Sequence, residues 1–428
     1  MAEPVQFSPA EPVDYLRFSE SKQHQAIPGH SSMLQLHAKF DSTWNAEPAV
    51  LRISTVPNRE EILRDSEAFV LAPGMSSLPS GFQAYLAIAP HTAVAVANDD
   101  TLRVRLLPNS MAYLSDGDIV YVRPRSGEIW VLYRRSARSN SMLLTERCNS
   151  RCLMCSQPPK EADDFHLTDT YLQAIPLMHP STPELGITGG EPTLLGPRLL
   201  EIIEQCKSHL PQTSLHMLSN GRLFSYLMLC EELAGLEHPD LMVGIPLYSD
   251  IASYHDFVVQ AQGAFDETIR GIMNLARCGV RVELRVVLHR ETVPQLPSLA
   301  RFVARNLPFV EHVALMGLEM MGYTKINLEG LWIDPIDYQP NLTTAVRALN
   351  RHGIDVSIYN HQLCTLNPEL WSYSRKSISD WKNEYLDVCH TCAVRDDCGG
   401  FFSSADLRHS AHIRPLTQTL HDAESLSV

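Results

Sequence analysis

Hydrophobic and polar positions follow one repeated pattern between residues 141 and 317. Each repeat has an apolar run of strand length, a turn, and then apolar residues at helical spacing. The stretch 197–210, PRLLEIIEQCKSHL, shows the helical spacing, and the stretch 265–279 ends at a glycine suited to a helix C-terminus. Six runs are predicted to be strands, at residues 141–146, 184–188, 213–221, 241–249, 280–288 and 310–317.

Strands that alternate with helices in this way predict a parallel sheet built from right-handed βα units. A strongly curved partial barrel and an open doubly wound sheet both fit the pattern, because periodicity does not separate them. In either case the loops that follow the strands meet at one edge of the sheet. In βα barrels this edge carries the active site.

The two ends of the chain differ from this central part. Residues 1–137 contain short apolar stretches without a repeated helix pattern, and alternation on both sides of Ser126–Gly127 predicts a hairpin. We expect part of the first forty residues to be disordered. A helix is predicted over 338–353 and a strand over 354–359, followed by a cysteine-rich tail. The predicted domains are residues 1–137, 138–336 and 337–428.

Composition narrows the class of protein. The 428 residues are 44% hydrophobic and 20% charged, as in an ordinary globular protein, and the formal net charge is -14. This charge argues against a broad electrostatic grip on nucleic acid or on an anionic membrane. No apolar run approaches the ~20 residues that a membrane span needs. The start of the chain lacks the features of a signal peptide, so a cytoplasmic location is expected.

The ten cysteines are unevenly distributed. Two groups of three stand close together, whereas Cys206, Cys230 and Cys278 are scattered and are interpreted as small core residues. In a reducing cytosol, clustered cysteines indicate a metal site or a catalytic site before a disulfide.

The first group is Cys148-x3-Cys152-x2-Cys155, in the loop after the first predicted strand. A structural zinc site takes four ligands, and His166 is too remote in sequence to be a convincing fourth. An iron–sulfur cube also takes four cysteines, one for each iron. Three cysteines on one loop would leave one iron of a cube free to bind another molecule.

A Gly-Gly-Glu-Pro turn follows the second predicted strand. Gly189 and Gly190 allow close approach of the backbone to a ligand, and Glu191 adds a carboxylate. Such a turn alone is a weak signal. One βα unit after a three-cysteine loop, it becomes a strong one.

With CNSRCLMC and GGEP, the segment 141–317 resembles the radical S-adenosylmethionine (SAM) superfamily. The resemblance implies an α/β fold with a partial barrel of six βα units. It implies that Cys148, Cys152 and Cys155 hold a [4Fe–4S] cluster whose open iron binds SAM. Reductive cleavage of SAM would give a 5′-deoxyadenosyl radical that abstracts hydrogen from the substrate. Gly189, Gly190 and Glu191 would contact the methionine part of SAM.

Weaker similarities to the family follow on later strands. Asn220 lies in the turn after the third strand, Ser249 follows the fourth, and Arg285 lies in the fifth, where the family often has a polar SAM contact. Each of them also fits a surface polar residue near a strand end.

The second group is Cys389-x2-Cys392-x5-Cys398, with Cys364 upstream. Four thiolates suit either zinc or a closed auxiliary [4Fe–4S] cluster. The spacing resembles the SPASM and twitch extensions of peptide-maturing radical SAM enzymes. No cysteine follows Cys398, so a single auxiliary cluster of the twitch kind fits better than two.

The order of the three parts, with LLTERCNSRCLMCSQPP, resembles the His-Xaa-Ser system radical SAM maturases of the HxsC type. The resemblance implies as substrate a ribosomally made precursor peptide with His-Xaa-Ser repeats. It also implies an electron donor of the flavodoxin or ferredoxin type and a second maturase as partners. The β-rich N-terminal part could dock a leader peptide by strand addition. Two other interpretations stay open: a radical SAM enzyme acting on a small molecule in cofactor biosynthesis, and a non-catalytic zinc-binding protein.

Overall fold

The computed structural model describes residues 35–75, 77–89, 104–377 and 384–417. Most of the first forty residues, for which disorder is expected, lie outside these ranges. None of the helices in the described ranges is long and apolar enough to cross a membrane.

The central sheet has eight strands in the order β15-β14-β13-β12-β11-β10-β9-β8, and every neighbouring pair is parallel. All six strands predicted between residues 141 and 317 are present in it, in chain order. The strands are β8 (Ser139–Leu143), β9 (Glu184–Thr188), β10 (Ser214–Leu218), β11 (Leu241–Pro246), β12 (Arg281–Leu288), β13 (His312–Gly317), β14 (Asp355–Tyr359) and β15 (Ser374–Arg375). The sheet therefore continues beyond residue 336 with two further strands.

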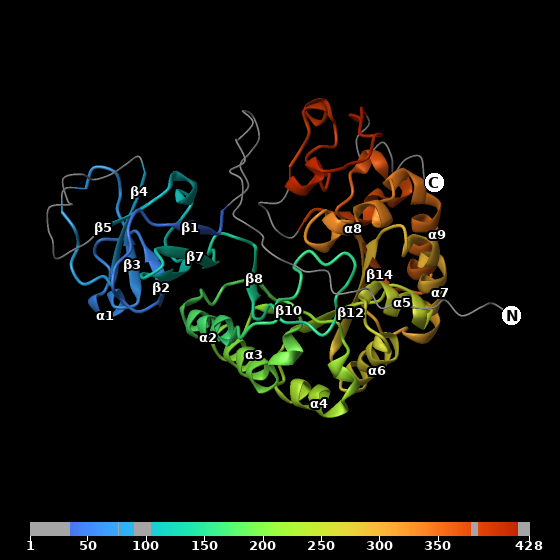
Figure 1. The fold of residues 1–428 in the computed structure, drawn as a ribbon, viewed down its shortest axis with the longest axis horizontal. Coiled ribbons are helices and arrows are strands. Elements are labelled where there is room, and N and C mark those ends of the chain that lie inside the picture. The colour runs from blue at the N-terminus through green and yellow to red at the C-terminus, as the bar shows by residue number, and fades with distance from the viewer. Residues whose placement is uncertain (1–34, 76, 90–103, 378–383, 418–428) are drawn as a thin grey trace. The chain divides into compact units, whose positions relative to one another are not determined.

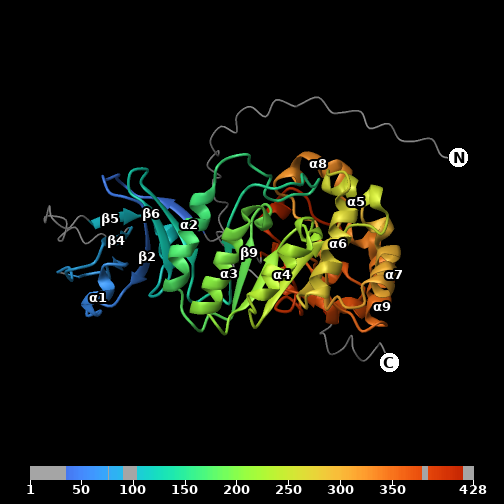
Figure 2. The same ribbon diagram turned by 90° about the horizontal axis from the view of Figure 1, so that it is seen from below.

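Helices cover the outer face of this curled sheet and form an arc around it (Figure 1). They are α2 (Phe165–Ala174), α3 (Pro197–His209), α4 (Leu227–Gly235), α5 (Ala252–Val259), α6 (Ala264–Arg277), α7 (Leu296–Asn306) and α9 (Gln339–Asn350). A further helix, α8 (Tyr323–Leu331), lies at the carboxyl edge of the sheet, where it contacts the loop after β8. Seen from below, α3, α4 and α6 lie in front of the strands (Figure 2). The expected α/β fold with a partial barrel is confirmed.

Alternation along each strand explains why one face of the sheet is covered. On β12, Leu284 and Val286 are 1% and 2% exposed and share one apolar core with Leu299 and Val303 of α7. Side chains alternate between the two faces of a strand, so Glu283 and Arg285 lie on the opposite, concave face. Cys206 and Cys230 are buried in the core as predicted, and Cys278 packs against it partly exposed.

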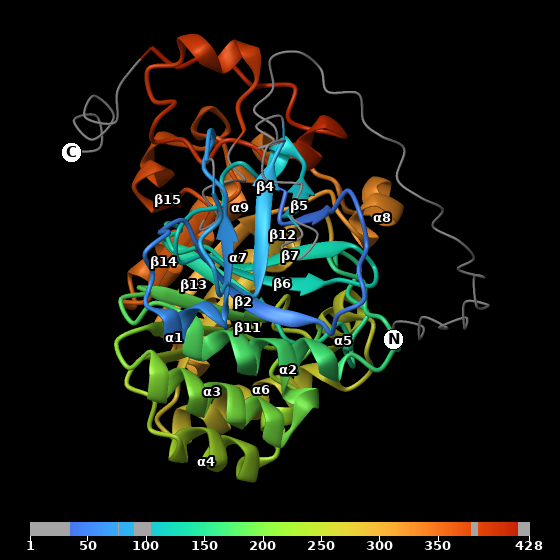
Figure 3. The same cartoon turned by 90° about the vertical axis from the view of Figure 1, so that its left-hand side faces the viewer.

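The N-terminal part forms a second sheet of mixed direction, which faces the viewer in Figure 3. The order is β1-β7-β6-β2-β3-β4-β5, and the predicted hairpin is β6–β7, with Gly127 in its turn at a φ of 67°. The sheet has its own apolar core around Ile53, Leu86 and Val120. Its strands are β1 (His37–Lys39), β2 (Ala49–Ser54), β3 (Glu67–Val70), β4 (Ala84–Ile88), β5 (Val104–Leu107), β6 (Ile119–Arg123) and β7 (Glu128–Tyr133), with a short helix α1 (Glu61–Arg64).

Candidate active site

The first cysteine loop follows β8 and is held by backbone hydrogen bonds on both sides. The amides of Arg151 and Leu153 donate to the carbonyls of Val259 and Val258, at 3.0 and 2.9 Å. The carbonyl of Cys155 accepts from the amide of Tyr323 at 2.9 Å, at the start of α8. The loop is thus fixed between α5 and α8 at the carboxyl edge of the sheet.

Asp164 holds the first residues of the same loop. Its buried carboxylate accepts hydrogen bonds from the hydroxyl of Thr145 (2.8 Å), the amide of Glu146 (2.5 Å) and Nε of Arg147 (3.1 Å). A helix-preceding aspartate is common in any sequence, so nothing in the pattern marked it as a loop anchor.

The three thiols of the loop are partly buried and near one another. Burial raises the pKa of Cys148 to about 11 and that of Cys152 to about 12, and mutual repulsion with the charged form of Cys155 raises both further. Three thiolates on this loop therefore need a positive centre to compensate them. The irons of a cluster would supply it, and three thiolates are the donor set that a cube with one open iron uses. The residues present fit such a group.

Gly189 and Gly190 bring the backbone after β9 into close contact with the cysteine loop. The amide of Gly190 donates to the carbonyl of Thr145, and the amide of Glu191 donates to the carbonyl of Arg147, both at 2.8 Å. A Cβ added at Gly189 or Gly190 would lie 2.3 Å from the Thr145 oxygen or 2.1 Å from the Arg147 oxygen. Gly189 also has a φ of 148°, which side chains rarely adopt. The two glycines thus allow the turn after β9 to approach the backbone of the cysteine loop, whereas the sequence led us to expect close approach to a ligand.

Glu191 is fully buried, and both of its carboxylate oxygens accept hydrogen bonds from the chain. Oε1 accepts from the amide and hydroxyl of Thr193 (3.1 and 2.5 Å) and from the hydroxyl of Ser219 (2.8 Å), and Oε2 accepts from the amide of Asn220 (2.6 Å). Burial raises the pKa of this carboxyl group, and these four donors oppose the rise. Glu191 therefore ties the turn after β9 to the turn after β10.

Asn220 links that second turn to the cysteine loop. Its side-chain amide nitrogen lies 3.9 Å from Sγ of Cys148 and donates to the side-chain oxygen of Asn149 at 2.5 Å. Its carbonyl accepts from the hydroxyl of Thr268 at 3.1 Å. Of the SAM-contacting residues predicted from the sequence, Asn220 therefore contacts a cysteine sulfur of the loop.

Arg222 is a loop-holding residue that sequence reasoning missed. It donates to the carbonyl of Asn149 and, at 3.3 Å, to the hydroxyl of Ser150, and it pairs with Glu267 at 2.6 Å. Its positive charge also lowers the pKa of the buried Cys152, although burial has the larger, opposite effect. The signal available in the sequence was its place two residues after Asn220, in the turn already singled out.

Ser249 is buried after β11 and shapes the turn into α5. Its hydroxyl accepts a hydrogen bond from the amide of Ile251 at 3.0 Å. The preceding residue, Tyr248, is buried near the cysteines: burial raises its pKa, and the charged forms of Cys152 and Cys155 raise it further. Tyr248, rather than Ser249, is therefore the residue that is affected by the charges of the cysteine loop.

His289 was also missed by the sequence reasoning, and it lies directly after β12, with its ring 6.5 Å from that of Tyr248. It is fully buried, and burial lowers its pKa to about 3, so the ring is neutral. Nδ1 accepts from the amide of Glu291 at 3.3 Å, which leaves the proton on Nε2. Within the described part of the chain, Nε2 has no hydrogen-bond partner. A buried donor without a partner at the carboxyl edge of the sheet is suited to bind a ligand.

Arg285 lies in a polar cluster on the concave face of the sheet. Its guanidinium donates to Glu283 at 2.6 Å and contacts the sulfur of Met316 at 3.1 Å. Glu283 also contacts His216 at 3.3 Å and His312 at 2.7 Å. Burial alone would raise the pKa of Glu283, but hydrogen bonds from both histidines and the charge of Arg285 hold it well below its usual range.

The second cysteine group comes together although Cys364 is remote from the others in sequence. All four cysteines line one cavity of about 20 Å³. Backbone amides donate to two of the sulfurs, from Leu363 to Cys398 at 3.5 Å and from Leu416 to Cys392 at 3.4 Å. Such hydrogen bonds to sulfur are common around iron–sulfur clusters. In the described residues, no group of three or more His, Cys, Asp or Glu side chains is placed to hold a single metal ion.

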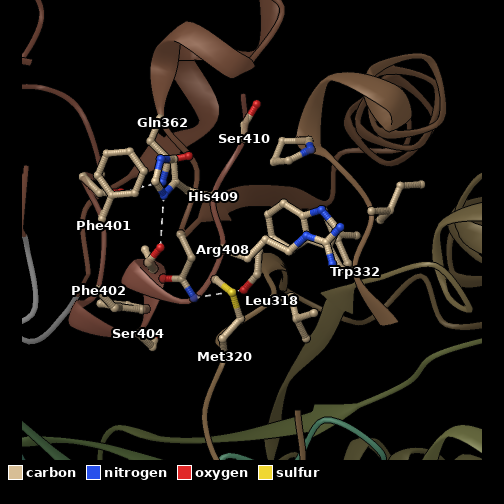
Figure 4. Close-up of a pocket in the computed structure, with 18 of the residues that line it drawn as sticks. Leu318, Met320, Trp332, Gln362, Phe401, Phe402, Ser404, Arg408, His409 and Ser410 are labelled. Atoms are coloured by element: carbon tan, nitrogen blue, oxygen red, sulfur yellow. Dashed lines mark hydrogen bonds between the residues drawn. The ribbon is translucent and has the colours of Figure 1, made fainter. Parts of the chain in front are cut away.

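A larger cavity of about 50 Å³ opens beside this group (Figure 4). Its walls come from the carboxyl ends of β12, β13 and β14, from the segment 332–338 and from residues 399–410. Gln362 and Phe401 line both this cavity and the cavity of the second cysteine group.

Comparison with known proteins gives a family match for the central part. The model of the radical SAM superfamily matches residues 142–303. No curated protein matches. Among solved structures, Streptococcus suis SuiB bound to S-adenosylmethionine has a TM-score of 0.44 and 16% identity, over 58% of this chain and 55% of that one. The anSMEcpe structure with bound AdoMet has a TM-score of 0.40 and 15% identity, over 51% of this chain and 62% of that one. HydG, a maturase of the [FeFe]-hydrogenase, has a TM-score of 0.38 and 8% identity, over 52% and 50%.

This chain therefore spans between half and three fifths of the length of those proteins. The family match contains the cysteine loop, the Gly-Gly-Glu-Pro turn and four strands after β8. A domain of this family implies SAM and a [4Fe–4S] cluster. The match identifies residues 142–303 as a radical SAM domain.

Proposed function

We propose that this protein is a radical SAM enzyme and that it modifies a ribosomally made peptide that bears His-Xaa-Ser repeats. The observation that carries the proposal is the arrangement of two cysteine groups in one chain, with a cavity beside the second group at the carboxyl edge of the sheet. A substrate in that cavity would lie between the cysteine-rich tail and the edge from which the first cysteine loop extends. The net charge of -14 suits a His-bearing or otherwise basic peptide.

In this proposal Cys148, Cys152 and Cys155 hold the cluster that binds SAM. When bound, the cluster and SAM supply the 5′-deoxyadenosyl radical that abstracts hydrogen from the substrate. The chain's own residues position the two reactants. The backbone of Gly189 and Gly190 would contact the methionine part of SAM, and Glu191 holds the turn that carries Asn220 against the cysteine loop.

Ser249 and Arg285 have supporting roles in the same proposal. Ser249 fixes the turn that places Tyr248 near the cysteines. Arg285 is close enough to Tyr248 to lower its pKa, although burial has the larger, opposite effect. Its guanidinium would thus supply a positive charge that a carboxylate group of bound SAM could pair with.

The tail is proposed to hold an auxiliary [4Fe–4S] cluster through Cys364, Cys389, Cys392 and Cys398. The shared cavity and the amide–sulfur hydrogen bonds support this ligand set. Anaerobically reconstituted protein should carry about eight irons, two cubes of four. About four irons and one zinc would make the tail a zinc site instead. A Cys364→Ser variant that keeps all eight irons would remove Cys364 from the ligand set.

The test of the peptide proposal is an anaerobic reaction of enzyme, SAM, reductant and the cognate repeat peptide, followed by mass spectrometry. We expect a loss of hydrogens or a new crosslink within the repeats. The matched control is the Cys148→Ala, Cys152→Ala, Cys155→Ala variant, which should release no 5′-deoxyadenosine. An unmodified peptide with turnover on a small metabolite would instead support an enzyme of cofactor biosynthesis. A flavodoxin or ferredoxin in place of chemical reductant, and a second maturase, can be added to the same assay.

The N-terminal sheet is proposed to bind the leader part of the peptide by strand addition. In the described residues this sheet ends at β1 on one side and β5 on the other, and an edge strand offers unpaired backbone groups to an extended peptide. Hydrogen–deuterium exchange should then show protection at β1 or β5 when the peptide is added. Protection confined to the radical SAM domain would contradict this role.

A further inference from the structure

The cavity shown in Figure 4 lies at the carboxyl edge of the sheet. Leu288 is the last residue of β12, and Leu318 and Met320 follow β13. Trp332 and Phe401 also line the cavity. Met320, Phe401 and Ala405 form a small apolar cluster of their own, with Trp332 packed against it. A ligand against these side chains would therefore meet carbon surface, whereas polar residues line the rest of the cavity.

Several polar groups around the cavity already have partners in the chain. The side-chain amide of Gln362 donates to the carbonyl of Gly400 at 2.7 Å, and the hydroxyl of Ser410 donates to Asp334 at 2.8 Å. Arg408 pairs with Glu329 at 3.0 Å and lies over the ring of Trp332. His409 contacts the carbonyl of Ala405 through Nδ1 at 3.1 Å. A charged ligand would have to compete with these partners for hydrogen bonds that replace its hydration.

The volume limits the size of the group that fits. A dry cavity of about 150 Å³ accepts benzene, and this one has about 50 Å³. The space therefore suits the tip of a branched aliphatic side chain better than an aromatic ring.

The position of the cavity links it to the second cysteine group. Gln362 and Phe401 separate the two cavities and line both. An occupant of the larger cavity would thus be one side chain away from the space that Cys364, Cys389, Cys392 and Cys398 surround.

We propose that this cavity binds one aliphatic side chain of the substrate peptide and so sets which residue of the peptide reaches the radical. The inference rests on the proposed peptide-modifying function. It adds a specificity pocket built from Leu318, Met320, Phe401 and Ala405. Burial of an isopropyl group in such a pocket should strengthen peptide binding roughly 30-fold, because fully burying an aliphatic side chain of this size contributes about 2 kcal/mol.

Filling the pocket tests the proposal. Ala405 is 9% exposed and lines the cavity, so Ala405→Leu would occupy the space with three further carbons. We expect the dissociation constant of the peptide to rise at least tenfold. The matched control is Ala276→Leu at a partly exposed position near the end of α6, where the dissociation constant should stay at the wild-type value. Iron content and SAM affinity of Ala405→Leu report whether the variant is folded.

A peptide series identifies the side chain that binds. Each aliphatic residue of the peptide is replaced by alanine in turn and tested against wild type and Ala405→Leu. One position should lose roughly 30-fold in affinity for wild type and little for the variant, because the two changes remove the same contact. If Ala405→Leu does not fold, Met320→Ala replaces it and should favour a larger aliphatic residue at that position.

The outcomes separate this inference from the function on which it rests. If wild type modifies the peptide and no aliphatic position couples to the pocket variant, the pocket proposal is wrong and the peptide function stands. If wild type binds and modifies no peptide but still cleaves SAM, the peptide function itself is wrong.

Discussion

Replacing Gly190 with alanine would place a Cβ 2.1 Å from the carbonyl oxygen of Arg147. Cβ atoms do not approach other heavy atoms closer than 3.0 Å, so the turn and the cysteine loop must separate by 0.9 Å or more. The displacement weakens two backbone hydrogen bonds, from Gly190 to Thr145 and from Glu191 to Arg147. Each contributes about 1 kcal/mol, and overpacking adds about 1–3 kcal/mol. We expect Gly190→Ala to lower the free energy of unfolding by about 3–5 kcal/mol.

The same displacement should disturb the first cluster, because Arg147 directly precedes Cys148. Guanidinium unfolding followed by circular dichroism measures the first effect, and iron content with the visible spectrum after anaerobic reconstitution measures the second. We expect iron to fall towards the four atoms of the tail cluster. The control is Gly235→Ala at the end of α4, where an added Cβ meets no atom within 4 Å. That variant should be as stable as wild type or up to about 1 kcal/mol more stable.

A Gly190→Ala protein with the wild-type unfolding midpoint and full iron content would refute this reasoning. It would mean that the turn after β9 and the cysteine loop can separate without loss of the site. Gly189 and Gly190 would then be needed only to let a ligand approach the backbone closely.

Three further changes have measurable outcomes. Glu191→Gln replaces one carboxylate oxygen with an amide NH₂ group, which would face hydrogen-bond donors of the chain. We therefore expect the unfolding free energy to fall by about 2–3 kcal/mol and SAM binding, measured by titration, to weaken. No change in either quantity would show that the four hydrogen bonds carry no energy. Arg222→Lys cannot contact Asn149, Ser150 and Glu267 at once, so reconstitution should give less iron in the first cluster, and full iron would contradict its loop-holding role. Burial lowers the pKa of His361 to about 4. The unfolded chain therefore binds a proton that the folded chain does not between about pH 6.5 and 4. Stability should fall by about 3 kcal/mol as the pH drops through that window, and His361→Gln should flatten this slope in unfolding measured at pH 7.5 and 5.

Local patterns in the sequence determined those features of this protein that depend on residues close together along the chain. Apolar spacing gave the six strands and the helices between them, because the inward face of each element must be apolar wherever it packs. The spacing of Cys148, Cys152 and Cys155 and the Gly-Gly-Glu-Pro turn indicated the chemistry, because one loop must supply all three ligands. The family resemblance added the partial barrel, which periodicity could not distinguish from an open sheet.

Tertiary structure alone decided which distant groups meet. Glu191 accepts from the amide of Asn220, and Arg222 reaches back to Asn149, since parallel strands bring their carboxyl ends to one edge. Cys364 joins the other tail cysteines at one cavity for the same kind of reason. In the described part of the chain, Nε2 of His289 is buried without a hydrogen-bond partner. No periodic signal encodes these contacts, because each depends on strand order, turn geometry and side-chain direction together rather than on spacing along the chain.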